Sequence, residues 1–169
     1  MPMIQVGYIA NGTEELSGGI FAQTNIDYRS IRNNLIFRIN FDGFGAAYTP
    51  KAPQTGTVSF EGDIGFTETV GGIGYKIPLK KHSILLFTQA GQRGYGYPEF
   101  NTTNGITSVK LAPHSISTIR FSIGHEFELE KHVFTSFELF WGQTLERKDY
   151  WVENPYSSGF TVGLTTLLW

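Results

Sequence analysis

The chain has 169 residues, of which 20 are glycine, 15% are aromatic, 17% are charged and none is cysteine. Ordinary soluble domains carry roughly 25% charged residues, so this chain is poor in charge. A net charge of −2 argues against nucleic acid as a partner. No apolar stretch approaches the roughly 20 residues of a transmembrane helix, which excludes a helical membrane bundle. We expect one domain spanning residues 1–169, without disulfides or thiolate metal sites.

Apolar and polar residues alternate along eight segments, which is the period of a β-strand. The 3.6-residue period of amphipathic helices is nearly absent. In chain order the alternating segments are Ile4–Ala10, Ile20–Arg29, Leu35–Asp42, Thr67–Ile77, Ile84–Tyr95, Ile119–Leu129, Val133–Gly142 and Phe160–Trp169. The sequence therefore predicts an all-β protein.

The connections between these segments alternate between short and long. The short ones are Arg29–Asn34, Leu79–His82 and Glu130–Lys131. The long ones are Asn11–Gly18, Gly43–Asp63, Gly96–Ser115 and Gln143–Ser158, and they are rich in turn and loop residues. This asymmetry is typical of membrane barrels. It predicts an eight-stranded antiparallel up-and-down transmembrane β-barrel with short periplasmic turns and long external loops.

The sidedness of the strands distinguishes a membrane barrel from a soluble one. The polar faces carry glycine, serine, asparagine and both signs of charge, without the lysine and glutamate surplus of a solvated surface. We therefore expect the apolar faces to point outward to lipid. The residues predicted to face lipid are Phe37, Ile39, Phe121, Ile123, Phe137 and Leu139.

The charges on the polar faces are predicted to form pairs inside the barrel. A turn centred on Lys80–Lys81 places Glu68 directly opposite Arg93. Asp27 lies within about one pair of Arg38 on the preceding hairpin, and the polar side of another hairpin holds Arg120 and Glu138. A narrow lumen requires such pairs, because an unpaired buried charge costs several kcal/mol. These six side chains are the predicted lumen network.

Aromatic residues gather near the two ends of the predicted strands. Tyr28, Tyr75, Phe127 and Trp169 lie near the short turns, and Tyr8, Phe44, Tyr97, Trp141 and Phe160 lie toward the long loops. Two such bands resemble the aromatic girdles of membrane barrels.

With its terminal strand Phe160–Trp169 ending on an aromatic residue, the chain resembles the small outer-membrane β-barrel proteins of the OmpA/OmpX type. The resemblance implies a Gram-negative outer membrane, outer-membrane lipid as surroundings, and both chain ends in the periplasm. It also implies that Trp169 is read by the barrel-assembly machinery. The more apolar face of this strand carries Phe160, Val162 and Leu164, and strict alternation places Trp169 on the opposite face. Either a bulge near Thr165–Thr166 switches faces or Trp169 points inward. The resemblance implies export, so we expect that an export signal has been removed or replaced ahead of the first strand.

Few residues suggest chemistry. A lipid A deacylase would need a serine and a histidine together, and His114 and Ser117 fall on opposite faces of an extended segment, with Ser115 merely adjacent. His125 is expected near the lipid headgroups. His82 and His132 would share a metal only if their hairpins were neighbours, which is a weak signal. We expect Glu126 to belong to a lumen network reaching Arg120 or Lys76, and we predict no catalytic residue, metal or cofactor.

The predicted function is that of a non-enzymatic outer-membrane barrel with a side-chain-filled lumen. It would act through its external loops or outer wall in structural support, adhesion or an envelope complex, with other envelope proteins as partners. Aromatic residues in the long loops are the contact candidates, namely Tyr97, Phe100, Tyr150 and Trp151. The alternatives are an enzyme that modifies lipid A and a soluble lipocalin-like carrier of a hydrophobic ligand.

Overall fold

A computed structural model describes residues 1–11, 18–30, 32–48, 62–96, 100–101, 108–109, 114–145 and 156–166. The strands are β1 (Pro2–Asn11), β2 (Gly19–Arg29), β3 (Leu35–Tyr48), β4 (Gly62–Leu79), β5 (His82–Gly96), β6 (Phe100–Asn101), β7 (Ser108–Val109), β8 (His114–Glu130), β9 (Val133–Thr144) and β10 (Tyr156–Thr166). Within these residues, no helix is long and apolar enough to span a membrane.

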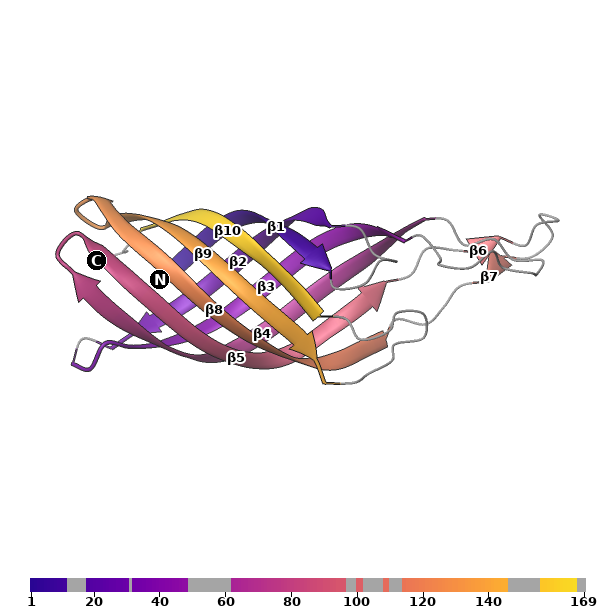
Figure 1. Cartoon of the computed structure of the whole chain (residues 1–169), viewed down its shortest axis with the longest axis horizontal. Helices are drawn as coiled ribbons and strands as arrows, with labels where there is room; N and C mark the ends of the chain where they lie inside the picture. Colours follow the sequence, from indigo (N-terminus) through magenta and orange to yellow (C-terminus); the bar gives the residue numbers. More distant parts are fainter. Residues whose placement is uncertain are drawn as a thin grey trace.

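Eight of the strands close into one antiparallel barrel (Figure 1). Their order around the barrel is β1-β10-β9-β8-β5-β4-β3-β2, and the first and last strands meet with Val6 opposite Val162. β6 and β7 form a separate two-stranded sheet beyond one end of the barrel. The predicted eight-stranded antiparallel architecture is confirmed.

The tight connections β2–β3, β4–β5 and β8–β9 lie at one end of the barrel, which we call the short-turn end. The opposite end, from which the longer connections depart, is the long-loop end (Figure 1). The β4–β5 hairpin turns at Lys80–Lys81 and has the predicted register, with Glu68 opposite Arg93. Lys80 and His132, both in turns, have positive φ values of 56° and 72°.

Several strands extend further than the alternation predicted. β4 has 18 residues and β8 has 17, whereas β1 has 10. The predicted loop boundaries are wrong here, because the strands continue into Gly43–Tyr48, Gly62–Thr67 and His114–Thr118. The outward positions in these extensions include glycine, serine and threonine. Such residues carry no apolar signal, although their backbones pair as well as any others.

The outward orientation of the apolar faces is confirmed. Ile39 and Ile123 are 46% and 51% exposed on the outer wall, while Arg38 and Arg120 on the same two strands are 1% exposed. The exposed apolar set also contains the other residues predicted to face lipid, Phe37, Phe121, Phe137 and Leu139. Successive side chains of a strand point to opposite faces, so each strand presents an apolar wall outward and a largely polar face inward.

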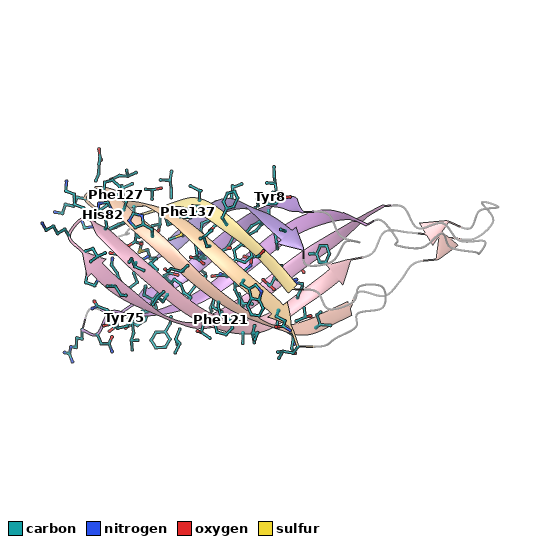
Figure 2. All side chains as sticks on the ribbon, in the orientation of Figure 1. Tyr8, Tyr75, His82, Phe121, Phe127 and Phe137 are labelled. Carbon is teal, nitrogen blue, oxygen red and sulfur yellow. The ribbon has the colours of Figure 1, made fainter. Side chains whose placement is uncertain are left out.

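The aromatic residues of the outer wall are less confined to its ends than predicted (Figure 2). Tyr28 and Tyr75 are exposed near the short-turn end, and Tyr8 and Trp141 toward the long-loop end. However, aromatic contacts also extend from the long-loop band to Phe137 on β9, since Phe160 stacks on both Tyr8 and Phe137 with ring centroids 6.5 and 6.1 Å apart. The wall therefore carries an aromatic ladder across β1, β10 and β9 in addition to the predicted girdles.

The apolar wall predicts that the loss of stability caused by a charged substitution depends on its position along the strand. Ile123→Lys should destabilise the barrel by about 2–4 kcal/mol, because this site lies in the middle of the apolar band. Ser117→Lys is the matched control on the same outward face of β8, nearer the long-loop end and opposite Gln92, and should cost about 0–1 kcal/mol. Urea unfolding in phospholipid vesicles measures both. If the two substitutions lowered the free energy of unfolding equally, the apolar band would have to extend as far as Ser117, which would contradict this prediction.

Candidate functional site

The six residues of the predicted lumen network all lie buried on the inner face of the barrel. They come from β2, β3, β4, β5, β8 and β9, so the network draws on most of the wall. Ion pairs join them, together with four further charged residues, into two clusters. The basal cluster consists of Lys76, Glu126, Arg29, Asp27, Arg38 and Glu138. The upper cluster consists of Asp42, Arg120, Glu68 and Arg93.

Arg38 is the centre of the basal cluster. Its Nε and Nη2 donate to the two carboxylate oxygens of Asp27 at 2.7 and 3.0 Å, and its Nη1 donates to Glu138 Oε2 at 2.6 Å. The guanidinium also lies 3.7 Å from the ring centroid of Phe87. A Cβ at Gly74 would collide with that ring, so glycine at this position makes room for Phe87. Bidentate pairing and ring stacking are the arrangement for which arginine suits a buried site better than lysine.

The basal cluster continues to the short-turn end through Glu126. Arg29 donates to both oxygens of this carboxylate at 2.9 and 2.6 Å, and Lys76 Nζ donates to Oε1 at 2.9 Å. The predicted link between Glu126 and Lys76 is therefore present in the structure. Arg29 also lies 3.3 Å from Asp27, which connects Glu126 to Arg38. The cluster contains three cationic and three carboxylate side chains, so its formal charges balance.

The upper cluster is built around Glu68. Arg93 Nη2 and Nε lie 2.9 and 3.1 Å from Glu68 Oε1, and Arg120 Nη2 lies 3.0 Å from Oε2. Arg120 Nη1 lies 2.6 Å from Asp42 Oδ2, which completes a set of two cations and two carboxylates. Arg93 also donates to Ser157 Oγ at 2.8 Å, so this cluster contacts β10 as well.

The pairing expected between Arg120 and Glu138 is replaced by other partners. In the β8–β9 ladder Arg120 lies opposite Gly142 and Glu138 opposite Gly124, so the two side chains are separated along the barrel. Arg120 pairs with Asp42 and Glu68 instead, and Glu138 pairs with Arg38. Sequence reasoning missed Asp42 and Arg29. Asp42 shares the inward face of β3 with Arg38, and that alternation was the one signal available.

Uncharged side chains fill the space around the clusters. Gln5 Oε1 accepts hydrogen bonds from Gln23 and Asn25 at 2.9 and 2.8 Å, and Gln5 donates to Ser136 at 3.2 Å. Buried apolar residues lie further toward the long-loop end, namely Ile9, Phe21, Phe66 and Ile116. In a barrel of eight strands the interior is just wide enough for side chains. The polar clusters and this apolar layer occupy that interior together.

The serines and histidines considered for catalysis or metal binding lie at different places on the barrel. Ser115 and Ser117 are exposed, and Ser115 Oγ donates to Gln92 Oε1 at 3.2 Å. His114 begins β8 opposite Tyr95. His82 contacts His125 on the outer wall, with nitrogens 3.1 Å apart. Within the described residues, no group of three or more His, Cys, Asp or Glu side chains is arranged to hold a metal ion.

The loop and terminal candidates fall largely outside the described residues. Tyr97, Tyr150, Trp151 and Trp169 are among the residues not described, and Phe100 is described only as part of β6. The last strand is described to Thr166, with Phe160, Val162 and Leu164 outward and Thr161, Gly163 and Thr165 inward. The more apolar face of β10 is thus the outer one.

Comparison with solved structures identifies the architecture. Neisserial surface protein A has 13% sequence identity and a TM-score of 0.67, and the alignment covers 98% of this chain and 96% of that one. The attachment invasion locus protein Ail of Yersinia pestis, solved with a heparin analogue, has 13% identity and a TM-score of 0.58 over the same shares. The fold is that of small outer-membrane barrels. No protein-family model and no curated protein matches the sequence.

The clusters predict unequal costs for removing a single arginine. Arg38→Met should destabilise the barrel by about 3–5 kcal/mol, because Glu138 loses its partner in a buried site. Arg93→Met should cost less, since Glu68 keeps Arg120 at 3.0 Å. Urea unfolding in vesicles measures both, with Arg32→Met in an exposed turn as a control expected to change stability by less than about 0.5 kcal/mol.

The triple variant Asp27→Asn, Arg38→Met, Glu138→Gln tests whether the cost arises from unpaired charge. It should be more stable than Arg38→Met alone, because the carboxylates that lose their partner are also neutralised. A triple variant that is less stable than the single one would show that packing, and not charge pairing, carries the effect.

Proposed function

We propose that the protein is an integral outer-membrane barrel without catalytic activity. Its lumen is filled by side chains, and its strands carry long loops at the cell surface. The observation that carries this proposal is the reversed sidedness of the wall. Large apolar side chains such as Ile20 and Leu164 are 75% and 61% exposed. Four arginines that pair with carboxylates point inward, namely Arg29, Arg38, Arg93 and Arg120. A wall of this kind suits lipid, since exposed apolar area on this scale is rare in soluble monomers.

A soluble carrier of a hydrophobic ligand fits the structure poorly. Such a carrier requires an apolar cavity inside the barrel and a polar exterior. Here the interior contains the basal and upper clusters, and the exterior contains the apolar wall. The two surfaces have the opposite character from the one a carrier needs.

A lipid A-modifying enzyme is also less favoured. A serine nucleophile needs a base within hydrogen-bond reach of its hydroxyl. Ser115 instead donates to the amide oxygen of Gln92, which cannot accept a proton as a histidine does. We therefore assign no catalytic role to His114, Ser115 or Ser117, and the proposed function requires no cofactor.

The proposed partners are outer-membrane lipid along the wall and envelope or surface molecules at the loops. Tyr97, Phe100, Tyr150 and Trp151 remain the predicted loop contacts, because aromatic residues are enriched in protein interfaces. Ail, the attachment invasion locus protein, shares the fold and was solved with a heparin analogue. An adhesive role for the loops of this chain is consistent with that likeness. Trp169 remains the predicted assembly signal.

The orientation predicts which connections a protease reaches from outside. Trypsin added to intact cells should cut within the long connections, which contain Lys51, Arg147 and Lys148, and should spare the Lys80–Lys81 turn in the periplasm. Mass spectrometry of the fragments identifies the cut sites. Cells with a permeabilised outer membrane are the control, in which Lys80–Lys81 becomes accessible. Cleavage at this turn in intact cells would contradict the proposed orientation.

The filled lumen predicts a barrel that does not conduct. Purified protein inserted in a planar lipid bilayer should show no steady ionic current, because ion-paired side chains and the apolar layer leave no continuous water path. A large porin reconstituted in the same way confirms that insertion gives a measurable signal. A steady, ion-selective conductance of the unmodified barrel would overturn the filled-lumen proposal.

A further inference from the structure

Two histidines meet on the outer wall near the short-turn end. His82 is the first residue of β5, and His125 lies on the adjacent strand β8, diagonal to it in the ladder. The distance between His82 Nδ1 and His125 Nε2 is 3.1 Å, and the ring centroids are 5.1 Å apart. Both side chains are exposed. The pair is separate from the ion-paired clusters, which lie on the inner face.

The surrounding structure holds the two rings in place. Phe127 lies directly opposite His82 in the ladder, and its ring centroid is 4.8 Å from that of His82 (Figure 2). The backbone N–H of Glu128 donates to the carbonyl of Lys81 at 3.0 Å, which ties β8 to the turn immediately before His82. The two imidazoles therefore stand on paired strands, and little conformational freedom is lost when they bind a common ligand.

The separation of the nitrogens matches that of two ligands on one metal ion. Metal–nitrogen bonds of about 2.0–2.1 Å place neighbouring ligands about 3.3–3.4 Å apart in tetrahedral geometry and about 2.8–3.0 Å apart in square-planar geometry. The observed 3.1 Å lies between these values. Small rotations about the Cβ–Cγ bonds, which are torsions with broad preferences, would turn both nitrogen lone pairs toward a common point.

The contact between the rings favours the same conclusion. Two neutral imidazole nitrogens in hydrogen-bond contact at 3.1 Å act as one donor and one acceptor, so one of them presents a lone pair. An anion would require two imidazolium rings in mutual contact, which their like charges oppose. A metal ion takes the place of the shared hydrogen without this repulsion.

We propose that His82 and His125 form a surface site for a divalent transition-metal ion, at the edge of the apolar wall. Imidazole nitrogen suits copper, nickel and zinc, and affinity should follow the order in which Cu²⁺ binds more tightly than Ni²⁺ or Zn²⁺. The protein supplies two ligands, and water supplies the remaining ones, because the pair lies near the short-turn end, at the level expected for the lipid headgroups. The bound ion links β5 to β8.

Titration of the purified barrel in detergent micelles with Cu²⁺ tests this site. We expect saturable binding of one ion per barrel, with nitrogen hyperfine structure from two imidazoles in the electron paramagnetic resonance spectrum. His82→Ala and His125→Ala should each weaken binding by about tenfold or more, since each removes one of two protein ligands. The heat-dependent shift in gel mobility verifies that each variant is folded.

His132→Asn and His114→Asn are the matched controls. Asparagine tolerates the positive φ of position 132, so the turn is preserved. Both controls should retain the unmodified affinity and spectrum. The proposal is overturned if the unmodified barrel shows no saturable binding, if His82→Ala binds as tightly as the unmodified barrel, or if the loss occurs in His132→Asn instead.

Discussion

Charge in a space without bulk water must be matched by charge, and the interior of this barrel is organised by that constraint. Arg38 is almost fully buried and is held by Asp27 on the adjacent strand and by Glu138 on β9, which shares no ladder with β3. Arg29 on β2 reaches Glu126 on β8 in the same way. These contacts cross the lumen, so they brace strands that backbone hydrogen bonds do not join.

Each cluster balances its own formal charges, and this affects what the barrel can do. An interior divided into two sets with balanced formal charges offers no net charge that would attract ions of one sign into the lumen. Breaking either cluster leaves charge unpaired, so both favour one closed arrangement of the wall. Function is therefore expected on surfaces the lumen does not use, namely the loops, the outer wall and the rim near the short turns.

The outer wall is divided by chemistry along its height. Ile73 and Ile77 on β4 face outward in the lower part, whereas Thr67 and Thr69 face outward higher on the same strand. On β5 the exposed side chain changes from Leu86 to Gln92 in the same direction. The long strands thus continue beyond the apolar band as a polar sheet. This extension gives the long connections a rigid, hydrogen-bonded base, which suits loops that bind a partner.

The sequence alone determined the existence of the eight barrel strands, their sidedness and the register of the β4–β5 hairpin. A two-residue turn at Lys80–Lys81 dictates that Glu68 faces Arg93, because hairpin register is set by local geometry. Contacts between strands joined by long connections were beyond that reasoning. Arg38 meets Glu138, Arg120 meets Asp42, and His82 meets His125 only because barrel closure and strand stagger bring distant segments together. Residue spacing predicts which residues pair within a tight hairpin, whereas the tertiary structure decides which side chains meet across the lumen and between β5 and β8.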